Sequence, residues 1–401
     1  MPRFHTIDDV DVAGKRVLVR ADLNVPVKNG KVADATRIER AALTIEALAA
    51  KGAKVVVMSH FGRPKGRDPS QSLRPLVGPL SRAIGGKEVQ FASDCIAPAA
   101  KAVVDALKPG EVALLENLRF HPEEEKNDPG FARQLAELGD VYVDDAFSAA
   151  HRAHASIEAL AHLLPNAAGK LMQAELLALG AALEHPQRPV MALVGGAKVS
   201  TKLDLLKFIV GKVDRLAIGG AMANTFLFAQ GHGVGRSMCE KELAAGAREV
   251  LSNAEKQGCR VILPDDVVIA DKLEAGATTS IVGVDAVPGN TMILDIGPRS
   301  VARLEAALLE CKTLVWNGPV GAFETPPFER ATLALANKVA ELTTAGKLLS
   351  VAGGGDTVAA LAAAGVADRF SYVSTAGGAF LEWLEGRALP GVVALAPDDH
   401  A

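Results

Sequence analysis

The sequence predicts an α/β protein of two domains, each a parallel sheet flanked by helices, joined by a helical hinge. Short apolar runs alternate with helical stretches along almost the whole chain, and this alternation is typical of βαβ units. A chain of 401 residues is too long for one ordinary core, so two domains are expected. A single helix that ends at two prolines interrupts the alternation in mid-chain.

The first half of the chain contains four clear strand candidates. They are the apolar runs at residues 16–20, 54–58, 112–115 and 141–143, with a weaker run at 89–91. Helical spacing separates them over residues 35–51, 75–84, 97–107 and 130–138. Because helices follow strands in turn, we expect a parallel sheet covered by helices.

The residues directly after these strands, together with one arginine near the start of the next helix, form a candidate site. They are Asp22, Leu23, Asn24, Arg37, His60, Phe61, Gly62, Arg63, Arg119 and Arg152. Ligands of open α/β sheets bind outside the carboxyl ends of the strands, so these residues are expected at one edge. Guanidinium groups match phosphate and carboxylate, and the cluster therefore predicts a site for a small, multiply charged anion. A single arginine is more often a solvated charge, and Asp22 and Asn24 could equally serve the turn before Pro26.

A helix predicted over residues 169–183 connects the two halves and stops at the two prolines of His185-Pro186-Gln187-Arg188-Pro189. We therefore expect a first domain at 1–168, an interdomain helix and linker at 169–189, and a second domain at 190–388. Apolar runs then recur at 190–194, 215–218, 260–263, 292–294, 313–316, 348–351 and 370–373.

The first strand of the second half predicts an anion site. Gly195-Gly196 follows it directly, and helical spacing starts at Lys198. Free N–H groups at a helix N-terminus attract anions, and Lys198 and Lys202 would share one helix face. Two solvated lysines beside an ordinary glycine turn explain the stretch equally well. The P-loop pattern, GxxxxGK before Ser or Thr, does not occur here.

A second glycine-rich loop indicates a nucleotide. The triple glycine at 353–355 lets backbone N–H groups approach a ligand closely. Asp356 and Thr357 open a helix predicted at 358–364, where they suit a helix cap, a magnesium-bound phosphate or both. Glu324 could bind a ribose hydroxyl or be an ordinary surface acid.

The composition argues against several classes of protein. A formal net charge of −4 argues against nucleic acid as the main partner. The four cysteines are scattered without a C-x-x-C pair, so neither a zinc site nor a disulfide framework is indicated. The N-terminus lacks an apolar core and no apolar run approaches the length of a membrane span. We therefore expect a cytoplasmic protein without membrane contact.

Read together, the loops resemble those of phosphoglycerate kinase. The matching stretches follow that family's order across nearly the whole chain and are RADLNVP (20–26), SHFGRP (59–64), ENLRF (116–120), DDAFSAAHRAHAS (144–156), VGGAKVSTK (194–202), IGGAMANTF (218–226), WNGPVGAFE (316–324) and AGGGDTVAA (352–360). The resemblance implies two Rossmann-like domains in a glycolytic enzyme that is usually monomeric. It also implies a reversible, Mg²⁺-dependent reaction of 1,3-bisphosphoglycerate with ADP that gives 3-phosphoglycerate and ATP.

The resemblance implies roles for single residues as well. It places the glycerate on Asp22, Leu23, Asn24, Arg37, His60, Phe61, Gly62, Arg63, Arg119 and Arg152. It places the nucleotide on Lys198, Lys202, Gly219, Gly220, Asn317, Pro319, Glu324, Gly354, Gly355, Asp356 and Thr357, with Asp356 at the metal. The tail at 389–401 is expected to fold back onto the first domain. Ala221 and Ala376 stand where the family often has glycine, so their methyl groups could crowd the nucleotide site.

The expected chemistry needs no general base. The acceptor in the reverse direction is a carboxylate, which is already ionised near neutral pH. Positioning and neutralisation of charge must therefore carry catalysis, and Arg37, Lys198 and the amides of Gly354 and Gly355 suit these roles.

Two other classes of protein also have two α/β domains. A nicotinamide dehydrogenase should show GxGxxG after a strand, which this sequence lacks. A hinged solute-binding protein would normally need export, and the sequence begins without a signal peptide.

Overall fold

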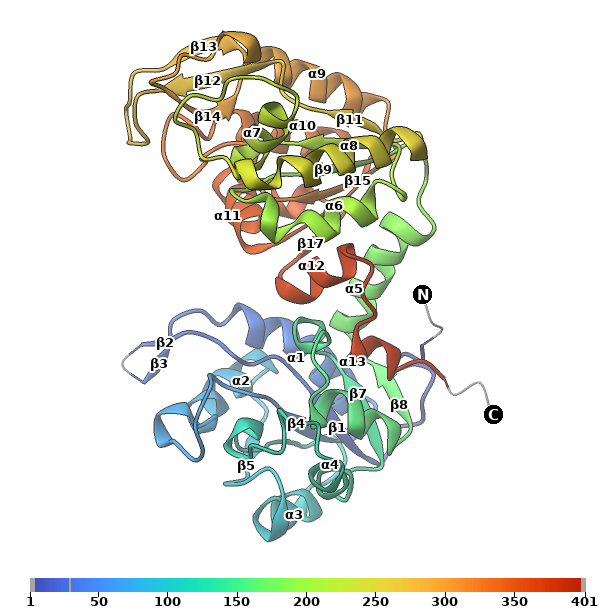
Figure 1. The fold of residues 1–401 in the computed structure, drawn as a ribbon. Coiled ribbons are helices and arrows are strands. Elements are labelled where there is room, and N and C mark those ends of the chain that lie inside the picture. Colours follow the sequence, from blue (N-terminus) through green and yellow to red (C-terminus); the bar gives the residue numbers. More distant parts are fainter. Residues whose placement is uncertain (1–3, 29, 398–401) are drawn as a thin grey trace. The chain divides into compact units, whose positions relative to one another are not determined.

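The chain divides into two compact units (Figure 1). The computed structural model describes residues 4–28 and 30–397. The first unit comprises the described residues up to Leu176 together with those from Ala388 onward, and the second runs from Leu177 to Arg387. Each unit contains a six-stranded parallel sheet with helices packed on it. The predicted α/β class, with two Rossmann-like domains, is confirmed.

The sheet of the first unit has the strand order β5-β6-β4-β1-β7-β8. Its strands are β1 (Arg16–Arg20), β4 (Lys54–Met58), β5 (Val89–Phe91), β6 (Val112–Leu114), β7 (Val141–Asp144) and β8 (Asn166–Ala168). The central strands are continuous apolar runs because both faces of a parallel sheet are covered. The edge strand β8 was missed, since Asn-Ala-Ala carries no strand preference.

The helices of the first unit are α1 (Thr36–Ala50), α2 (Val77–Ala83), α3 (Ala97–Ala106) and α4 (Pro129–Ala136). Helix α4 begins where the side chain of Asp128 accepts a hydrogen bond from Phe131 N at 2.8 Å. Helix α13 (Pro390–Val393) belongs to this unit, because Gly391 N donates to Ala150 O at 2.9 Å. Shorter elements are β2 (Val27–Lys28), β3 (Lys31–Val32), 3₁₀ turns at 69–71, 74–76, 118–120, 147–149 and 160–162, and a π-helical turn at 155–159.

The parallel sheet of the second unit has the order β11-β10-β9-β15-β16-β17. Its strands are β9 (Val190–Val194), β10 (Arg215–Ile218), β11 (Arg260–Ile262), β15 (Thr313–Asn317), β16 (Leu349–Gly353) and β17 (Tyr372–Ser374). Six of the seven runs predicted in this half are these strands. The seventh, at 292–294, does not continue the parallel sheet as expected.

That seventh run is β14 (Met292–Ile296), which belongs to a separate antiparallel sheet of order β13-β12-β14. The other two strands of this sheet, β12 (Asp266–Ala270) and β13 (Ser280–Gly283), were not predicted. An apolar run identifies a strand but not its partner, because pairing is decided by packing far along the chain.

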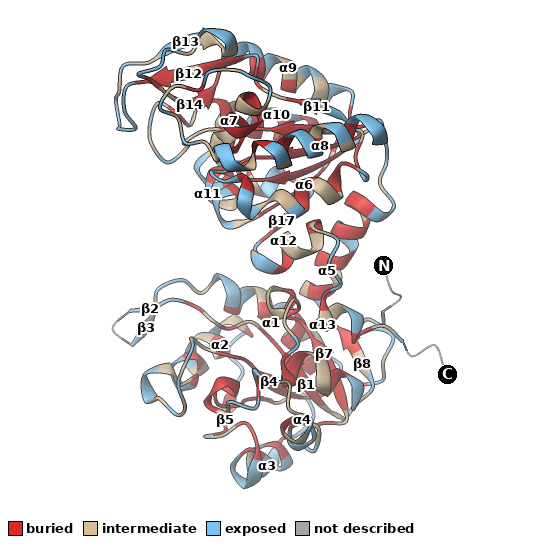
Figure 2. Cartoon of the chain, viewed as in Figure 1, coloured by how far each residue is buried: buried red, intermediate tan, exposed pale blue. Residues whose placement is uncertain are grey.

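The helices of the second unit are α6 (Leu203–Ile209), α7 (Gly220–Ala229), α8 (Ala244–Gln257), α9 (Pro298–Leu309), α10 (Arg330–Thr344), α11 (Gly355–Ala363) and α12 (Gly378–Leu384). Short 3₁₀ turns lie at 199–201, 241–243, 284–286 and 367–369. In Figure 2 the central strands of the two parallel sheets are buried, whereas the helices expose part of their surface. None of the described helices has the length and hydropathy that a membrane span requires.

Helix α5 (Lys170–Leu179) spans the boundary between the units and continues into a π-helical turn at Gly180–Glu184. The carboxylate of Asp145 accepts hydrogen bonds from Leu171 N at 2.8 Å and Met172 N at 3.3 Å, which anchors the start of the helix. A helix was predicted here, but its π-helical end was not.

Candidate active site

The loops after β1, β4 and β6 meet at the carboxyl edge of the first sheet. The side chain of Asn24 accepts a hydrogen bond from Gly62 N at 3.0 Å. From the other side, Arg119 donates to Gly62 O at 2.7 Å. Gly62 has φ +60° and an added Cβ would lie 2.0 Å from Gln71 Oε1, so this position requires glycine. The structure therefore brings together loops that the sequence places nearly 100 residues apart.

Arg37 is held by one edge of its guanidinium group. Its Nη1 lies 3.0 Å from Asp22 Oδ2 and 2.9 Å from Asn24 O. Ser148, from the loop after β7, donates to the same oxygen of Asp22 at 2.6 Å. The Arg37 side chain is 44 % exposed, so it remains accessible to a ligand.

His60 is nearly buried and has a defined tautomer. Arg20 Nη2 lies 3.0 Å from His60 Nδ1, and because arginine can only donate, Nδ1 accepts. The proton of neutral His60 therefore lies on Nε2. Burial, followed by the charges of Arg20 and Arg119, holds the pKa of His60 well below its usual value. His60 is thus a neutral hydrogen-bond donor at neutral pH.

A buried chain of polar groups orients Arg20 in turn. Its Nε donates to Ser156 Oγ at 2.8 Å, and Ser156 Oγ donates to Glu124 Oε1 at 2.6 Å. Arg20 and Glu124 are both fully buried, so each balances the charge of the other. Arg20, Ser156 and Glu124 were not identified from the sequence. The only available signal was a charged residue that ends an otherwise apolar strand.

The remaining cations make this edge strongly positive. Arg119 is 7 % exposed, and its Nε, which is 3.5 Å from Glu125, makes no hydrogen bond. Burial and the charges of Arg119, Arg20 and Arg152 lower the pKa of His154 to about 4. Arg63 is exposed, and no ion pair or hydrogen bond joins its side chain to another described residue. A buried guanidinium nitrogen without a hydrogen bond, beside further positive charge, favours an anionic ligand.

In the second unit, the positions of Lys198 and Lys202 differ from the prediction that both lie on one helix. Lys198 is in an extended conformation before the 3₁₀ turn, and α6 starts only at Leu203. The two lysines therefore do not share a face of one α-helix. Lys198 is exposed, whereas Lys202 Nζ donates to Gly195 O at 2.6 Å and Asn317 O at 3.1 Å. Burial lowers the pKa of Lys202 to about 8.

The glycine loops of this unit pack directly against one another. Gly220 has φ +68°, and an added Cβ would lie 2.5 Å from Gly196 O. A Cβ on Gly195 would lie 2.0 Å from Pro319 O. Gly219 is constrained as well, because its Cβ would meet the side chain of Val320 at 2.7 Å. These backbone segments can approach one another, and a ligand, only because side chains are absent.

The loop before α11 offers free polar groups. Asn317 Nδ2 donates to Gly353 O at 2.9 Å, but its buried Oδ1 has no hydrogen-bond partner. Gly354 precedes the helix with φ +97°, so the helix begins at Gly355 instead of the predicted residue 358. Asp356 lies exposed in the first turn, where backbone N–H groups lack intrahelical partners. This arrangement suits an anion accompanied by a cation.

The hydroxyl of Thr357 already has two hydrogen-bond partners within the protein. Its Oγ1 accepts from Gly318 N at 2.7 Å and donates to Gly353 O at 2.8 Å. The residue is 1 % exposed. The hydroxyl thus joins the loop at Gly318 to the turn at Gly353.

A cavity of about 330 Å³ lies beside these loops. Its apolar lining includes Ala221, Met238, Leu273, Met292 and Phe323. The predicted residues Gly220, Pro319, Glu324 and Asp356 line it as well. The apolar part could not be predicted, because it includes residues from the antiparallel sheet and from loops without a motif. A planar apolar group attached to a charged group fits such a cavity.

Comparison with known proteins identifies the family. The family description of phosphoglycerate kinase matches residues 7–387. A phosphoglycerate kinase of Rhodospirillum centenum is 61 % identical over 393 residues, which cover 98 % of this chain and 99 % of that protein. One from Rhodopseudomonas palustris is also 61 % identical, and covers 98 % of each chain. The chain belongs to the phosphoglycerate kinase family.

Solved structures of phosphoglycerate kinases agree with this assignment. The enzyme of Coxiella burnetii has a TM-score of 0.91 at 41 % identity, and that of Pyrococcus horikoshii has 0.80 at 30 % identity. Each comparison covers 98 % of both chains. The protein is therefore a glycolytic kinase that acts on small molecules, with ATP and ADP as substrates.

Proposed function

We propose that this enzyme transfers a phosphoryl group reversibly between 1,3-bisphosphoglycerate and ADP, to give 3-phosphoglycerate and ATP. The observation that carries the proposal is the division of the site between the two units. One unit has a cluster of arginines suited to a small anion, and the other has glycine loops beside an apolar cavity suited to a nucleotide. A kinase that joins a small phosphorylated acid to a nucleotide needs both.

The glycerate site is proposed at the carboxyl edge of the first sheet. The ligand contacts are Asp22, Leu23, Asn24, Arg37, His60, Phe61, Gly62, Arg63, Arg119 and Arg152. Three features support them: His60 presents a proton on Nε2, Arg119 has a buried Nε without a hydrogen bond, and Arg63 is exposed. Charge-assisted hydrogen bonds from guanidinium groups are strong enough to hold a carboxylate and a phosphate.

The nucleotide site is proposed on the loops of the second unit. Its residues are Lys198, Lys202, Gly219, Gly220, Asn317, Pro319, Glu324, Gly354, Gly355, Asp356 and Thr357. The apolar cavity would receive the base, and the N-terminus of α11 would receive phosphates. Lys202 and Thr357 would act mainly by holding the loops in place, since their polar atoms already bond the backbone.

The nucleotide site also fits Mg²⁺. Asp356 offers an exposed carboxylate at the helix start, and oxygen ligands are those that Mg²⁺ prefers. Asn317 Oδ1 is a buried acceptor without a partner in the same loop system. When bound with the nucleotide, Mg²⁺ neutralises phosphate charge. We assign Asp356 as the residue that holds it.

Catalysis is proposed to need no general base, because both acceptors are already anionic near neutral pH. The neutral state of His60 agrees with a role in binding rather than in removing a proton. Arg37, Lys198 and the amides of Gly354 and Gly355 would offset the charge of the transferring group. In-line transfer needs reacting atoms about 3–3.5 Å apart, so the two units must bring their ligands together by closure about the α5 region.

We further propose that the enzyme is cytoplasmic and monomeric. The domains are proposed as residues 1–168 with the tail at 389–401, the connecting region 169–189, and 190–388. The tail assignment is supported by the hydrogen bonds from Gly391 N to Ala150 O and from Asn166 to Ala394 O. Its last residues, 398–401, lie outside the described part of the chain.

The test is a coupled assay of ADP formation from Mg-ATP, with and without 3-phosphoglycerate. Activity should require both 3-phosphoglycerate and Mg²⁺. In parallel, 3-phosphoglycerate and Mg-ATP should each raise the melting temperature of the wild-type chain. Arg119→Ala should abolish the shift caused by 3-phosphoglycerate and retain the shift caused by Mg-ATP. Loss of both shifts together, or ATP turnover that ignores 3-phosphoglycerate, would contradict the proposal.

A further inference from the structure

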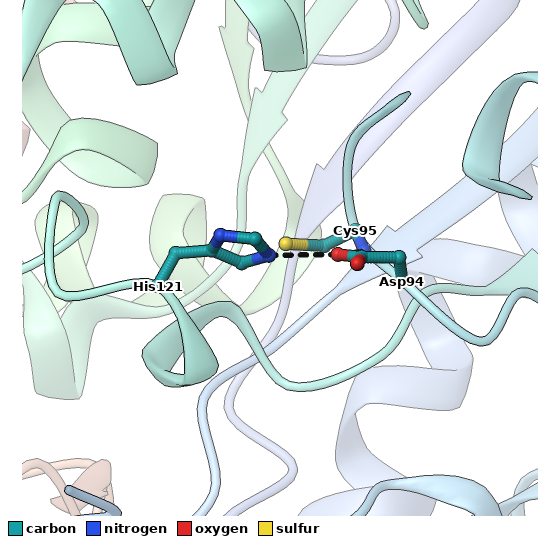
Figure 3. Close-up of side chains that lie close together, drawn as sticks. All are labelled: Asp94, Cys95 and His121. Carbon is teal, nitrogen blue, oxygen red and sulfur yellow. Dashed lines mark hydrogen bonds and ion pairs between the residues drawn. The ribbon is translucent and has the colours of Figure 1, made fainter. Parts of the chain in front are cut away.

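A cluster of metal-binding side chains lies in the first unit, on residues that the proposed reaction does not use. Asp94 and Cys95 follow β5, and His121 directly follows the 3₁₀ turn that carries Arg119 (Figure 3). One carboxylate oxygen, the thiol sulfur and one imidazole nitrogen all lie within 4.8 Å of one another. Within residues 4–28 and 30–397, no other group of three such ligands is this close.

The geometry is close to that of a cation site. His121 Nε2 lies 2.7 Å from Asp94 Oδ1, so a hydrogen-bonding proton lies between them. The sulfur of Cys95 lies beside this hydrogen bond in Figure 3. Bonds of about 2.0–2.3 Å to a tetrahedral ion place its ligands about 3.3–3.8 Å apart. The nitrogen and oxygen, whose bonds are at the short end of this range, therefore need to separate by about 0.6 Å, a change that side-chain rotation can provide.

The cluster has one buried side and one accessible side. Cys95 is fully buried, whereas the side chains of Asp94 and His121 are each 26 % exposed. A hydrated cation can thus meet the oxygen and nitrogen first and the sulfur last. The ring of His121 packs against Phe131 with centroids 5.3 Å apart, which limits its orientation. Arg67 also lies 3.3 Å from Asp94 Oδ2, so the cation would take Oδ1 and leave this ion pair in place.

We propose that Asp94, Cys95 and His121 form a binding site for a divalent ion of the zinc class, with water as the fourth ligand. One thiolate, one imidazole and one carboxylate favour Zn²⁺ or Co²⁺ over Mg²⁺, which prefers oxygen ligands. On binding, the thiol proton of Cys95 leaves to solvent, and His121 binds the ion through Nε2 with its proton on Nδ1. The site is distinct from the proposed Mg²⁺ position at Asp356, which lies in the other unit. The bound ion would join the loop after β5 to the loop that carries Arg119.

The test uses Co²⁺ as a spectroscopic probe of the full-length, metal-stripped, reduced protein in excess Mg²⁺. One Co²⁺ per chain should produce a thiolate-to-metal charge-transfer band and the intense visible bands of tetrahedral cobalt. Added Zn²⁺ should abolish both signals by displacement. Cys95→Ser should remove the charge-transfer band, while Cys259→Ser, which changes another buried cysteine, should retain it. His121→Gln should weaken Co²⁺ binding on the order of 100-fold or more, since removal of a metal ligand weakens binding more than removal of a group that supports the ligand.

The His121→Gln variant is expected to fold normally, because the residue is partly exposed. It also leaves the proposed catalytic groups unaltered. Circular dichroism and basal kinase activity without added Zn²⁺ or Co²⁺ should match the wild type. Absence of a charge-transfer band in the wild type would overturn the proposal. A band that persists in Cys95→Ser, or that disappears equally in Cys259→Ser, would overturn it as well.

Discussion

Lys198 and Lys202 have different surroundings although only three residues separate them in the sequence. Lys198 is exposed, whereas Lys202 bonds two backbone carbonyls and its pKa falls to about 8 on burial. In the proposed mechanism Lys198 contacts the transferring phosphoryl group, whereas Lys202 bonds the backbone of the glycine loops. Spacing alone could not separate these roles.

We expect Lys198→Ala to lower kcat much more than it raises KM for Mg-ATP. A contact made mainly in the transition state affects kcat, and one charge-assisted contact contributes on the order of 3 kcal/mol, or about a hundredfold in rate. Steady-state kinetics with both substrates varied measures the split. Lys207→Ala is the matched control, because this lysine on α6 pairs with Glu249 on α8 and is not among the proposed site residues. A near-normal kcat with a raised KM would show that Lys198 serves binding alone.

The contact between Arg20 and His60 predicts a pH dependence. In the wild type, His60 stays neutral through the physiological range because burial and Arg20 lower its pKa. Arg20→Met removes that charge, so the pKa of His60 should rise. Because a protonated histidine attracts an anion more strongly, affinity for 3-phosphoglycerate should then increase as the pH falls from about 7.5 to 6.

Arg20→Lys is the control for this prediction, since it keeps the charge and the low pKa of His60. Isothermal titration calorimetry at several pH values gives the affinities, and the ¹⁵N shifts of His60 report its protonation directly. Circular dichroism identifies any variant that fails to fold after Glu124 loses its buried partner. A folded Arg20→Met with an unchanged His60 titration would refute the assignment.

At the scale of elements, the turn before α11 illustrates how a backbone conformation builds a site. Gly354 has φ +97°, and an added Cβ would lie 2.7 Å from Asn317 Nδ2. Its conformation sets the direction in which the first N–H groups of the helix point. The same Asn317 joins β15 to this turn through Gly353 O. A change at Gly354 therefore affects two loops at once.

We expect Gly354→Ala to raise KM for Mg-ATP at least tenfold and to lower the melting temperature slightly. Strain at a positive φ costs on the order of 1–3 kcal/mol, and the contact with Asn317 adds to it. Gly346→Ala is the matched control, because Gly346 also has positive φ but an added Cβ there meets nothing within 4 Å. Equal kinetic effects of the two substitutions would mean that Gly354 matters only for stability. Differential scanning fluorimetry and initial rates provide the comparison.

At the scale of the whole molecule, the main feature of the proposal is that each unit binds one of the two substrates. All proposed glycerate residues precede Arg152 or are Arg152 itself, and all proposed nucleotide residues follow Val194. Each ligand should therefore bind its own unit independently. In the proposed mechanism, transfer between the two ligands requires closure of the two units.

We expect the radius of gyration to fall when 3-phosphoglycerate and a non-hydrolysable Mg-ATP analogue are both present. Either ligand alone should cause a smaller change, because closure needs contacts from both units. Small-angle X-ray scattering measures the radius, and Arg119→Ala with both ligands is the control that should remain open. Rotation is expected in the loops near 165–169 and 186–189, which flank the connecting helix. No change in the ternary complex would contradict closure.

The sequence by itself determined most of the local structure. Strands appeared as buried apolar runs and helices as periodic stretches, because these patterns depend on burial of nearby residues. The order of the glycine and arginine loops was also sufficient to recognise the family. Candidate residues at strand ends followed from the rule that parallel strands present their carboxyl ends at one edge.

Only the tertiary structure decided which residues support those candidates. Arg20 bonds Ser156, 136 positions away in the sequence. The apolar cavity includes residues of the antiparallel sheet, of which the sequence predicted only the run at 292–294, and assigned that run to the parallel sheet. The tertiary structure also showed that the side chains of Lys202 and Thr357 form hydrogen bonds with the backbone. The physical reason is that burial, hydrogen-bond partners and pKa depend on groups brought together by packing. Periodicity records which side of an element is buried, but it contains no information about the residue on the other side of the contact.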